Sequence, residues 1–428
     1  MKLSRVWAFG LAMLAPGLVA VGAAALNAPR TLHHGKASES HLTEPHRAAG
    51  HRAPAHIARL AARSAPTHAA PARLTARGQA RAGARRVALH SRRHHYYERF
   101  TASSFARGNI GDDDITAGED PVVRQAAIDA LGDMNGTAVV IDPSNGRVLA
   151  MVNQKLALSP GAEPCSTIKL TVAMAALSEG LVTRDTPVKL AGFRMNMTQA
   201  LAKSNNLYFE ELGRELGFDR VRHYANQFGL GELAGYNIDG EQLGVYPDQE
   251  LPAAEGGVAR MCSFGQGVSL TPLQLGAFVA AIANGGTLYY LQHPATPEEA
   301  AALEPKVKRT LNIAQYVPDL QDGMAGAVEY GTARSLRVNF RELPVFGKTG
   351  TCSDKGTRFG WFASYADSPQ GSLVTVFFLE GGRPTFGPRA AEMTGEFYKN
   401  LWDRNYFAAK GQQETAAVPA ANSRQAQP

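Results

Sequence analysis

Two β-rich regions that lie far apart in the sequence constrain the fold of this chain most. In the first, residues 137–142 and 147–153 are rich in apolar and β-branched residues and are separated by Pro-Ser-Asn-Gly, a hairpin signal. In the second, residues 345–352, 361–365 and 373–379 predict three further strands, the last two joined by a Ser-Pro-Gln-Gly turn. We expect both regions to contribute to one antiparallel sheet.

The sequence between and around these regions favours helices. Apolar residues at helical spacing predict helices over residues 121–131, 271–284 and 390–403, and most of the stretch from 166 to about 284 has a helical pattern. These observations predict an α/β (α+β) fold: an antiparallel sheet flanked by helices, with an inserted all-helical subdomain. A groove between the sheet and this subdomain is where a substrate site is expected.

The N-terminal segment, residues 1–26, has the pattern of an export signal. Lys2 and Arg5 precede an apolar run over residues 6–26 that contains no charge. A helix of about 21 residues just spans the hydrocarbon core of a bilayer, so a cleaved signal peptide and a retained anchor both stay open. Either one predicts an exported domain that is periplasmic or otherwise extracytoplasmic. If the segment is retained, it anchors the domain in the inner membrane.

Residues 27–115 are predicted to be a disordered linker, because Ala, His, Arg, Pro and Thr dominate and large apolar residues are few. The whole chain carries a net charge of +6, whereas residues 27–107 carry +12 and residues 1–26 carry +2, which leaves −8 for residues 108–428. The basic charge therefore belongs to the linker and does not indicate a nucleic-acid partner.

Two interpretations of the linker stay open. It is either a solvated spacer or a polybasic strip that contacts anionic lipid headgroups or cell-wall polymers. Ten of the twelve histidines lie in it, without a repeated metal-ligand spacing. Residues 116–410 are the expected folded domain, and residues 411–428 are an expected disordered tail.

Three short motifs follow one another in the expected domain: Ser166-Thr-Ile-Lys169, Ser204-Asn-Asn206 and Lys348-Thr-Gly-Thr351. Together they supply a nucleophile, two amines, a second hydroxyl and an amide, the set needed to attack an activated amide through a serine ester. Each motif alone has an ordinary structural explanation: a helix N-cap with a solvated lysine, a turn, and a strand that ends in a turn. Their order and spacing favour the chemical interpretation.

Local geometry indicates how the first motif works. A serine at a helix start lies beside free backbone N–H groups and the positive end of the helix dipole, which favour an attacking alkoxide. Lys169, three residues after Ser166, lies on the same helix face. A lysine that accepts the serine proton must be neutral part of the time, and a second cation, Lys348, close to it would lower its pKa.

With their flanking blocks, the motifs resemble the transpeptidase domain of the penicillin-binding proteins, in particular the monofunctional class B kind, within the serine β-lactamase and D,D-peptidase superfamily. The resemblance covers about residues 120–405. The similar blocks lie at residues 136–152, 204–213, 228–231, 263–275, 330–334 and 347–351.

The chain also departs from the class B pattern. Only the basic linker stands where these proteins usually carry a large pedestal domain, and no glycosyltransferase domain is recognisable. The stretch between Val152 and Ser166 is shorter than usual, and Cys165 stands where a glycine usually precedes the serine. These departures argue against a standard role in a division or elongation complex.

The resemblance implies a role for each motif residue. Ser166 is the nucleophile, Lys169 is its base, and Ser204 relays a proton between Lys169 and the leaving amine. Lys348 faces the serine, and Asn206 binds the substrate amide. The remaining substrate-binding residues are Thr349, Gly350 and Thr351, of which the two threonines hold a substrate carboxylate. The backbone N–H groups of the nucleophile and of the last threonine form the oxyanion hole.

The implied activity is that of a serine D,D-transpeptidase or D,D-carboxypeptidase. Its substrates are peptidoglycan stem peptides, β-lactams acylate it, and it needs no cofactor or metal. Two rivals stay open: a hydrolytic β-lactamase of the same fold, and a catalytically idle wall-binding or sensor protein. Against the lactamase, the text after the second motif has no Glu-x-x-Leu-Asn pattern, and Glu210 and Glu211 follow the motif too closely to replace it.

The positions of two cysteines resemble those of a known disulfide. Cys165 directly precedes the nucleophile and Cys352 directly follows the third motif, a pair of positions that resembles a disulfide beside the active serine of class A carbapenemases. An exported protein meets an oxidising environment, in which such a bridge can form. Cys262 would be left over, and three small buried thiols are the alternative.

Overall fold

The structure is a computed structural model in which residues 101–408 are described. The predicted export segment, residues 27–100 of the predicted linker and the predicted tail at 411–428 lie outside the described residues. Within residues 101–408, no helix is both long enough and apolar enough to cross a bilayer.

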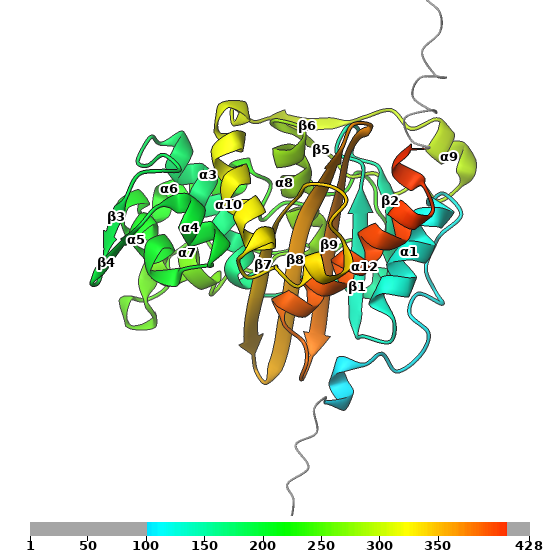
Figure 1. Cartoon of the computed structure of the whole chain (residues 1–428), viewed down its shortest axis with the longest axis horizontal. Helices are drawn as coiled ribbons and strands as arrows, with labels where there is room; N and C mark the ends of the chain where they lie inside the picture. The colour runs from blue at the N-terminus through cyan, green and yellow to red at the C-terminus, as the bar shows by residue number, and fades with distance from the viewer. Residues whose placement is uncertain (1–100, 409–428) are drawn as a thin grey trace, which may run out of the picture. The chain divides into compact units, whose positions relative to one another are not determined.

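A five-stranded antiparallel sheet forms the centre of the domain, in the order β2-β1-β9-β8-β7 (Figure 1). Its strands are β1 (Gly136–Ile141), β2 (Val148–Val152), β7 (Val345–Asp354), β8 (Thr357–Ser368) and β9 (Gly371–Gly381). β1 pairs with β9 over its whole length, so the first hairpin joins the C-terminal strands. This confirms the prediction of one antiparallel sheet built from both ends of the domain.

Helices cover both faces of the sheet because the strand residues alternate between two apolar clusters. Ala138 and Val140 belong to one cluster, whereas Val139 and Ile141 belong to the other. The first cluster is covered by α1 (Pro121–Leu131), α11 (Leu336–Asn339) and α12 (Gly387–Asp403), and the second by α8 (Pro272–Ala283). The three predicted flanking helices are therefore present, with α12 starting earlier than expected.

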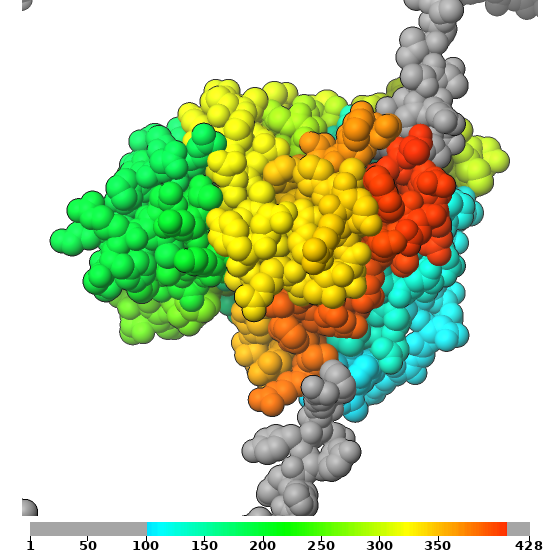
Figure 2. All heavy atoms as spheres, in the orientation of Figure 1, coloured from blue at the N-terminus to red at the C-terminus, as the bar shows by residue number. Residues whose placement is uncertain are grey.

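The inserted subdomain is the green lobe of Figures 1 and 2, and it confirms the prediction of a helical insertion. It contains α3 (Lys169–Ser178), α4 (Met197–Ala202), α5 (Asn206–Leu216), α6 (Phe218–Gln227) and α7 (Gly257–Phe264), with a small hairpin of β3 (Val188–Leu190) and β4 (Phe193–Met195). Helix α10 (Val317–Glu329), yellow in Figure 1, contacts both α4 and β7 and so joins this lobe to the sheet.

The remaining elements are short. They are η1 (Ala102–Ser104), α2 (Gln154–Ala157), η2 (Cys165–Ile168), η3 (Ala253–Glu255), β5 (Thr287–Tyr289), α9 (Pro297–Ala301), β6 (Val307–Thr310) and η4 (Ala314–Tyr316). Two of the longer helices begin at caps that the sequence encodes. Asp120 accepts from the N–H groups of Val122 and Val123, and Thr271 forms a reciprocal capping box with Gln274.

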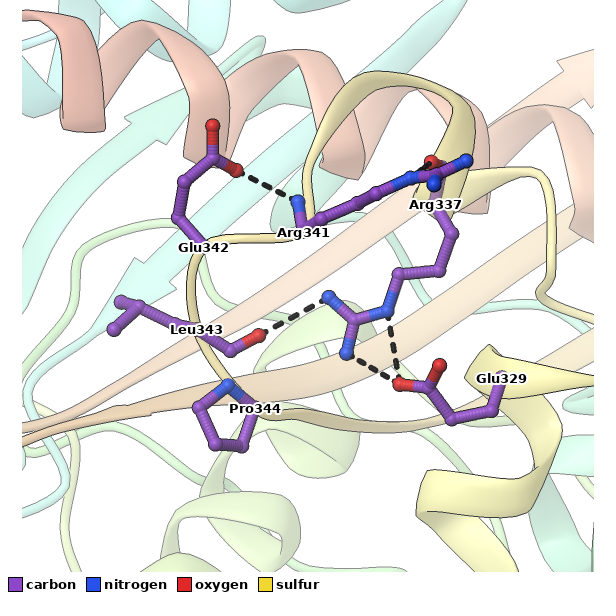
Figure 3. Close-up of a pocket in the computed structure, with 6 residues that line it drawn as sticks. All are labelled: Glu329, Arg337, Arg341, Glu342, Leu343 and Pro344. Atoms are coloured by element: carbon purple, nitrogen blue, oxygen red, sulfur yellow. Dashed lines mark hydrogen bonds and ion pairs between the residues drawn. The ribbon is translucent and has the colours of Figure 1, made fainter.

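An arginine clamp holds the start of β7 in place (Figure 3). The Arg337 guanidinium on α11 pairs with Glu329 at 2.6 Å and donates to the carbonyl oxygens of Phe340 and Leu343 at 3.2 and 3.0 Å. A hollow of about 570 Å³ lies beside Arg337. Because the guanidinium already pairs with Glu329 and with two carbonyl oxygens, we assign this arginine a structural role in positioning β7.

Residues before the predicted domain boundary at residue 116 contact the folded part of the chain. Ser104 is buried and its hydroxyl donates to the carbonyl oxygen of Arg383 at 2.9 Å. Asp114 accepts from the backbone N–H groups of Asn153 and Gln154 and pairs with Arg124 at 2.8 Å. Residues 101–115, which the sequence assigns to the linker, thus include side chains that contact the backbone of the folded part. Hydrogen bonds to remote backbone groups hold this segment in place. Such contacts cannot be predicted from the number of apolar residues in a segment.

Asp114→Ala should lower the free energy of unfolding by about 2–4 kcal/mol, because it leaves two part-buried N–H groups and the Arg124 guanidinium without their acceptor. The measurement is guanidinium denaturation of the oxidised protein. Asp113→Ala is the matched control, since Asp113 is exposed and should change the value little. Equal values for the two variants would contradict the anchoring role of Asp114.

Candidate active site

Ser166 lies in the short 3₁₀ turn η2 that leads directly into α3, rather than at the first residue of the α-helix itself. Lys169 is the first residue of α3 and is completely buried. Its Nζ donates to Ser166 Oγ at 2.7 Å. The turn therefore brings the nucleophile and the amine of the first motif into direct contact, as the i, i+3 spacing predicts.

Lys169 has two further acceptors from other parts of the chain. Its Nζ donates to Asn206 Oδ1 at 2.9 Å and to the carbonyl oxygen of Ser263. The rings of Phe209 and Phe264 lie 5.7 and 5.8 Å from the same nitrogen. The sequence predicted neither the contact from Asn206 nor that from Ser263.

These contacts define what happens when Lys169 is neutral. A neutral amine has two N–H donors and one lone pair, and the oxygens of Asn206 and Ser263 can only accept. Of the three partners only the Ser166 hydroxyl can turn round and donate to Nζ. Deprotonating Lys169 thus aims its lone pair at the proton of the nucleophile.

The second and third motifs meet at a second lysine. Lys348 on β7 is completely buried, and its Nζ donates to Ser204 Oγ at 2.8 Å and to the carbonyl oxygen of Thr349 at 2.9 Å. Ser204 adopts a φ of +53° between α4 and α5, where the chain turns sharply. Asn205 caps α5, because its side chain accepts from the backbone N–H of Tyr208. The residues on either side of it, Ser204 and Asn206, contact the two lysines of the site.

Burial lowers the pKa of both lysines. It lowers the pKa of Lys169 to about 7, an effect that the nearby Glu210 carboxylate partly opposes. The pKa of Lys348 is lowered well below its ordinary value, first by burial and then by the positive charge of Lys169. The predicted neutral fraction of Lys169 is therefore supported, but its main cause is burial rather than the charge of Lys348.

The remaining residues of the third motif alternate across β7. Gly350 faces the nucleophile turn, where a Cβ would lie 2.8 Å from the carbonyl oxygen of Pro164, so only glycine fits. The Thr349 hydroxyl is 2.6 Å from that of Thr332, and Thr351 Oγ1 accepts from the N–H of Gly387 at the start of α12. Both threonine hydroxyls thus have partners in the protein, and their role with a substrate carboxylate stays a prediction.

Cys165 and Cys352 form a disulfide that joins the nucleophile turn to β7. Cys165 has a φ of +52°, a region in which a residue with a Cβ is strained by about 1–2 kcal/mol. This backbone geometry favours a glycine at the position. Cys262 is the remaining thiol and is fully buried, and burial raises its pKa.

The site as a whole offers a serine nucleophile, a buried amine with a low pKa, and a second hydroxyl held by a second amine. It suits acyl transfer, since it can take a proton from the nucleophile and return one to a leaving amine. Ser204 Oγ accepts from Lys348 Nζ, and the predicted proton relay from Lys169 through Ser204 stays a prediction. Among residues 101–408, no group of three or more His, Cys, Asp or Glu side chains is placed to hold a metal ion.

Comparison with known proteins identifies similar chains. Residues 136–399 match the family described as the penicillin-binding protein transpeptidase domain. Stage V sporulation protein D of Bacillus subtilis is 27% identical over 61% of this chain and 48% of its own length. The peptidoglycan D,D-transpeptidase MrdA of Acinetobacter baumannii is 25% identical over 67% of this chain and 54% of its own. The chain thus spans about half the length of these curated relatives.

The fold is also shared with a solved structure. Pseudomonas aeruginosa PBP2, solved in complex with WCK 5153, superimposes with a TM-score of 0.56 at 23% identity, covering 67% of this chain and 74% of that one. At this identity the likeness supports the predicted fold class alone.

Alkylation followed by mass spectrometry should find no reactive thiol in the native protein. Cys262 is buried, and the other two cysteines are bonded to each other. Unfolding in guanidinium without a reductant should expose one thiol, and adding a reductant should expose three. Three thiols in the unreduced, unfolded protein would show that no bridge forms.

Proposed function

The chain belongs to the penicillin-binding protein transpeptidase domain family, and we propose that it is a serine D,D-transpeptidase that acts on peptidoglycan stem peptides and is acylated by β-lactams. The observation that carries the proposal is the 2.7 Å contact between the buried Lys169 amine, whose pKa is lowered to about 7, and Ser166 Oγ. The name of the similar MrdA protein, a peptidoglycan D,D-transpeptidase, supports the same substrate class.

The first step is acylation of Ser166. Neutral Lys169 takes the hydroxyl proton as Ser166 Oγ bonds to the carbonyl carbon between the two terminal D-alanines of the donor. The oxygen that becomes negative lies between the backbone N–H groups of Ser166 and Thr351. Each donor of such a pair contributes about 3–4 kcal/mol to the transition state.

The second step releases the terminal D-alanine. The C–N bond breaks, and the departing nitrogen takes a proton through the Ser204 hydroxyl, which Lys348 Nζ orients by donating to its Oγ. The proton that replaces it is the one that Lys169 took from Ser166, so Lys169 is neutral again when the amine has left. Asn206 keeps Lys169 in position through Oδ1, and its NH₂ group is available for the donor amide. The product is an ester between Ser166 and the shortened donor.

Attack by an amine on this ester gives the cross-link, and attack by water gives carboxypeptidation. Both routes use the same acyl-enzyme, so transpeptidation is favoured here on the names of the relatives. The domain would act outside the cytoplasm, with residues 1–26 as signal or anchor and the basic segment after it as a tether to the membrane or wall.

A hydrolytic β-lactamase needs a base that activates water against the ester. Glu210 is the acidic residue nearest the second motif in sequence. Its partly buried carboxylate pairs with Arg214 at 3.3 Å and acts on Lys169 through its charge. Among the described residues, no carboxylate forms a hydrogen bond or ion pair with Ser166 or Lys169. The acyl-enzyme is therefore expected to be long-lived.

Acylation by a fluorescent penicillin should accelerate as the pH rises through about 7 and level off above, because neutral Lys169 is the base and its pKa lies there. Lys169→Ala should slow acylation by about 10²- to 10⁴-fold and remove this rise. Lys203→Ala is the control, since Lys203 is exposed beside the second motif and lies outside the site. A flat profile in the unaltered protein, or a Lys169 variant at the same rate, would exclude Lys169 as the base.

The penicilloyl adduct should sit on Ser166 and persist for minutes or longer, because no water-activating base contacts the ester. Intact-mass measurements over time give the decay, and peptide mapping gives the position, with Ser166→Ala as the unlabelled control. Rapid turnover of nitrocefin that Ser166→Ala abolishes would favour the β-lactamase instead.

A further inference from the structure

The loop at residues 330–334, between α10 and α11, takes no part in the proposed chemistry, yet it contacts two of the motif segments. Thr332 makes both contacts. Its backbone N–H donates to the carbonyl oxygen of Ala202 at 3.1 Å, two residues before Ser204. Its side-chain hydroxyl oxygen lies 2.6 Å from that of Thr349 on β7. One threonine outside the three motifs thus joins the segment before the second motif to the third.

The backbone on either side of Thr332 is tightly packed. A Cβ on Gly331 would lie 2.1 Å from the carbonyl oxygen of Ala202, so only glycine fits there. Ala333 is completely buried, and its N–H donates to the carbonyl oxygen of Ala327 on α10 at 2.8 Å. Because these contacts hold the loop from both sides, the Thr332 side chain meets β7 in one defined place.

The pair of hydroxyls has one proton to spare. Each threonine hydroxyl carries one proton, and either oxygen can be the donor in the 2.6 Å contact. Within residues 101–408, neither the Thr332 nor the Thr349 hydroxyl has another hydrogen-bond partner. The contact therefore uses one proton and leaves the other free. A carboxylate can only accept, so a carboxylate that reaches Thr349 takes the proton of Thr349, and Thr332 must then donate within the pair.

This arrangement makes Thr349 a better donor. A hydroxyl that accepts one hydrogen bond is polarised, which strengthens the bond that it donates, and a bond to a charged acceptor is stronger than a neutral one. Thr349 is also buried, so water competes little for its hydroxyl. Thr351 differs, because its Oγ1 accepts from the backbone N–H of Gly387, a group that can only donate. The donor role of Thr351 thus needs no second side chain.

We propose that Thr332 is a positioning residue for the terminal carboxylate of the donor, an inference that rests on the proposed function and on the carboxylate contact predicted for Thr349. Thr332 acts through Thr349: it donates to Thr349 Oγ1 and so directs the remaining proton at the carboxylate. Its backbone contact to Ala202 holds this pair against the segment that leads to Ser204.

The test uses the full chain and compares benzylpenicillin with its methyl ester, which lacks the anionic carboxylate. The readout is the second-order rate constant for acylation of Ser166, followed by intact mass over time. The ratio of the two constants is the carboxylate preference. Thr332→Val removes the hydroxyl at nearly constant shape and should lower this preference about tenfold, which corresponds to about 1.4 kcal/mol. Thr332→Ser keeps the hydroxyl and should keep most of the preference.

A second variant makes the result independent of how well valine is accommodated. Thr332→Ala removes the hydroxyl without adding an atom and should lower the preference in the same way. Complete labelling of each variant by excess benzylpenicillin reports that it has folded. Thr310→Val, at an exposed threonine on β6, is the matched control and should leave both rate constants unchanged.

The ratio separates positioning from packing. A loop that had merely lost packing would react more slowly with both compounds, and an unchanged ratio in Thr332→Val and Thr332→Ala would overturn the positioning role. Equal reaction of the unaltered chain with the two compounds, or a loss of preference in Thr332→Ser as large as in Thr332→Val, would overturn it as well. Failure of benzylpenicillin to acylate Ser166 in the unaltered chain would instead overturn the proposed function itself.

Discussion

The feature on which the rest of the structure depends most is the exclusion of the Lys169 amine from water. Lys169 is fully buried, and removal from water is the main reason that its pKa falls to about 7. Such a group is costly to bury as an ion, so the surrounding fold must supply acceptors for its protonated form. Asn206 and the carbonyl oxygen of Ser263 do so, and their fixed positions leave Ser166 as the partner that can reverse its hydrogen bond.

Meeting this requirement needs segments from three parts of the chain. The nucleophile turn supplies Ser166 and Lys169, the start of α5 supplies Asn206, and the end of α7 supplies Ser263. Strand β7 closes the site with Lys348, and the disulfide between Cys165 and Cys352 ties that strand to the turn. The site therefore forms only when the helical insertion docks on the edge of the sheet, which α10 and the clamp at Arg337 hold in place.

The sequence by itself determined the elements and the reactive groups. Helix α1 has the predicted bounds, the strands lie where alternating and β-branched runs placed them, and Ser166 with Lys169 follows from a local i, i+3 spacing. The sequence did not show that side chains of residues 101–115 contact the folded part, since those contacts are hydrogen bonds to backbone groups remote in sequence.

Only the tertiary structure decided that Lys169 contacts Asn206 and that Ser204 contacts Lys348. A local pattern can encode periodicity and caps, but the meeting of remote side chains depends on how whole elements pack. Packing of apolar faces sets the path of the chain, and this path brings the three short motifs together in one site.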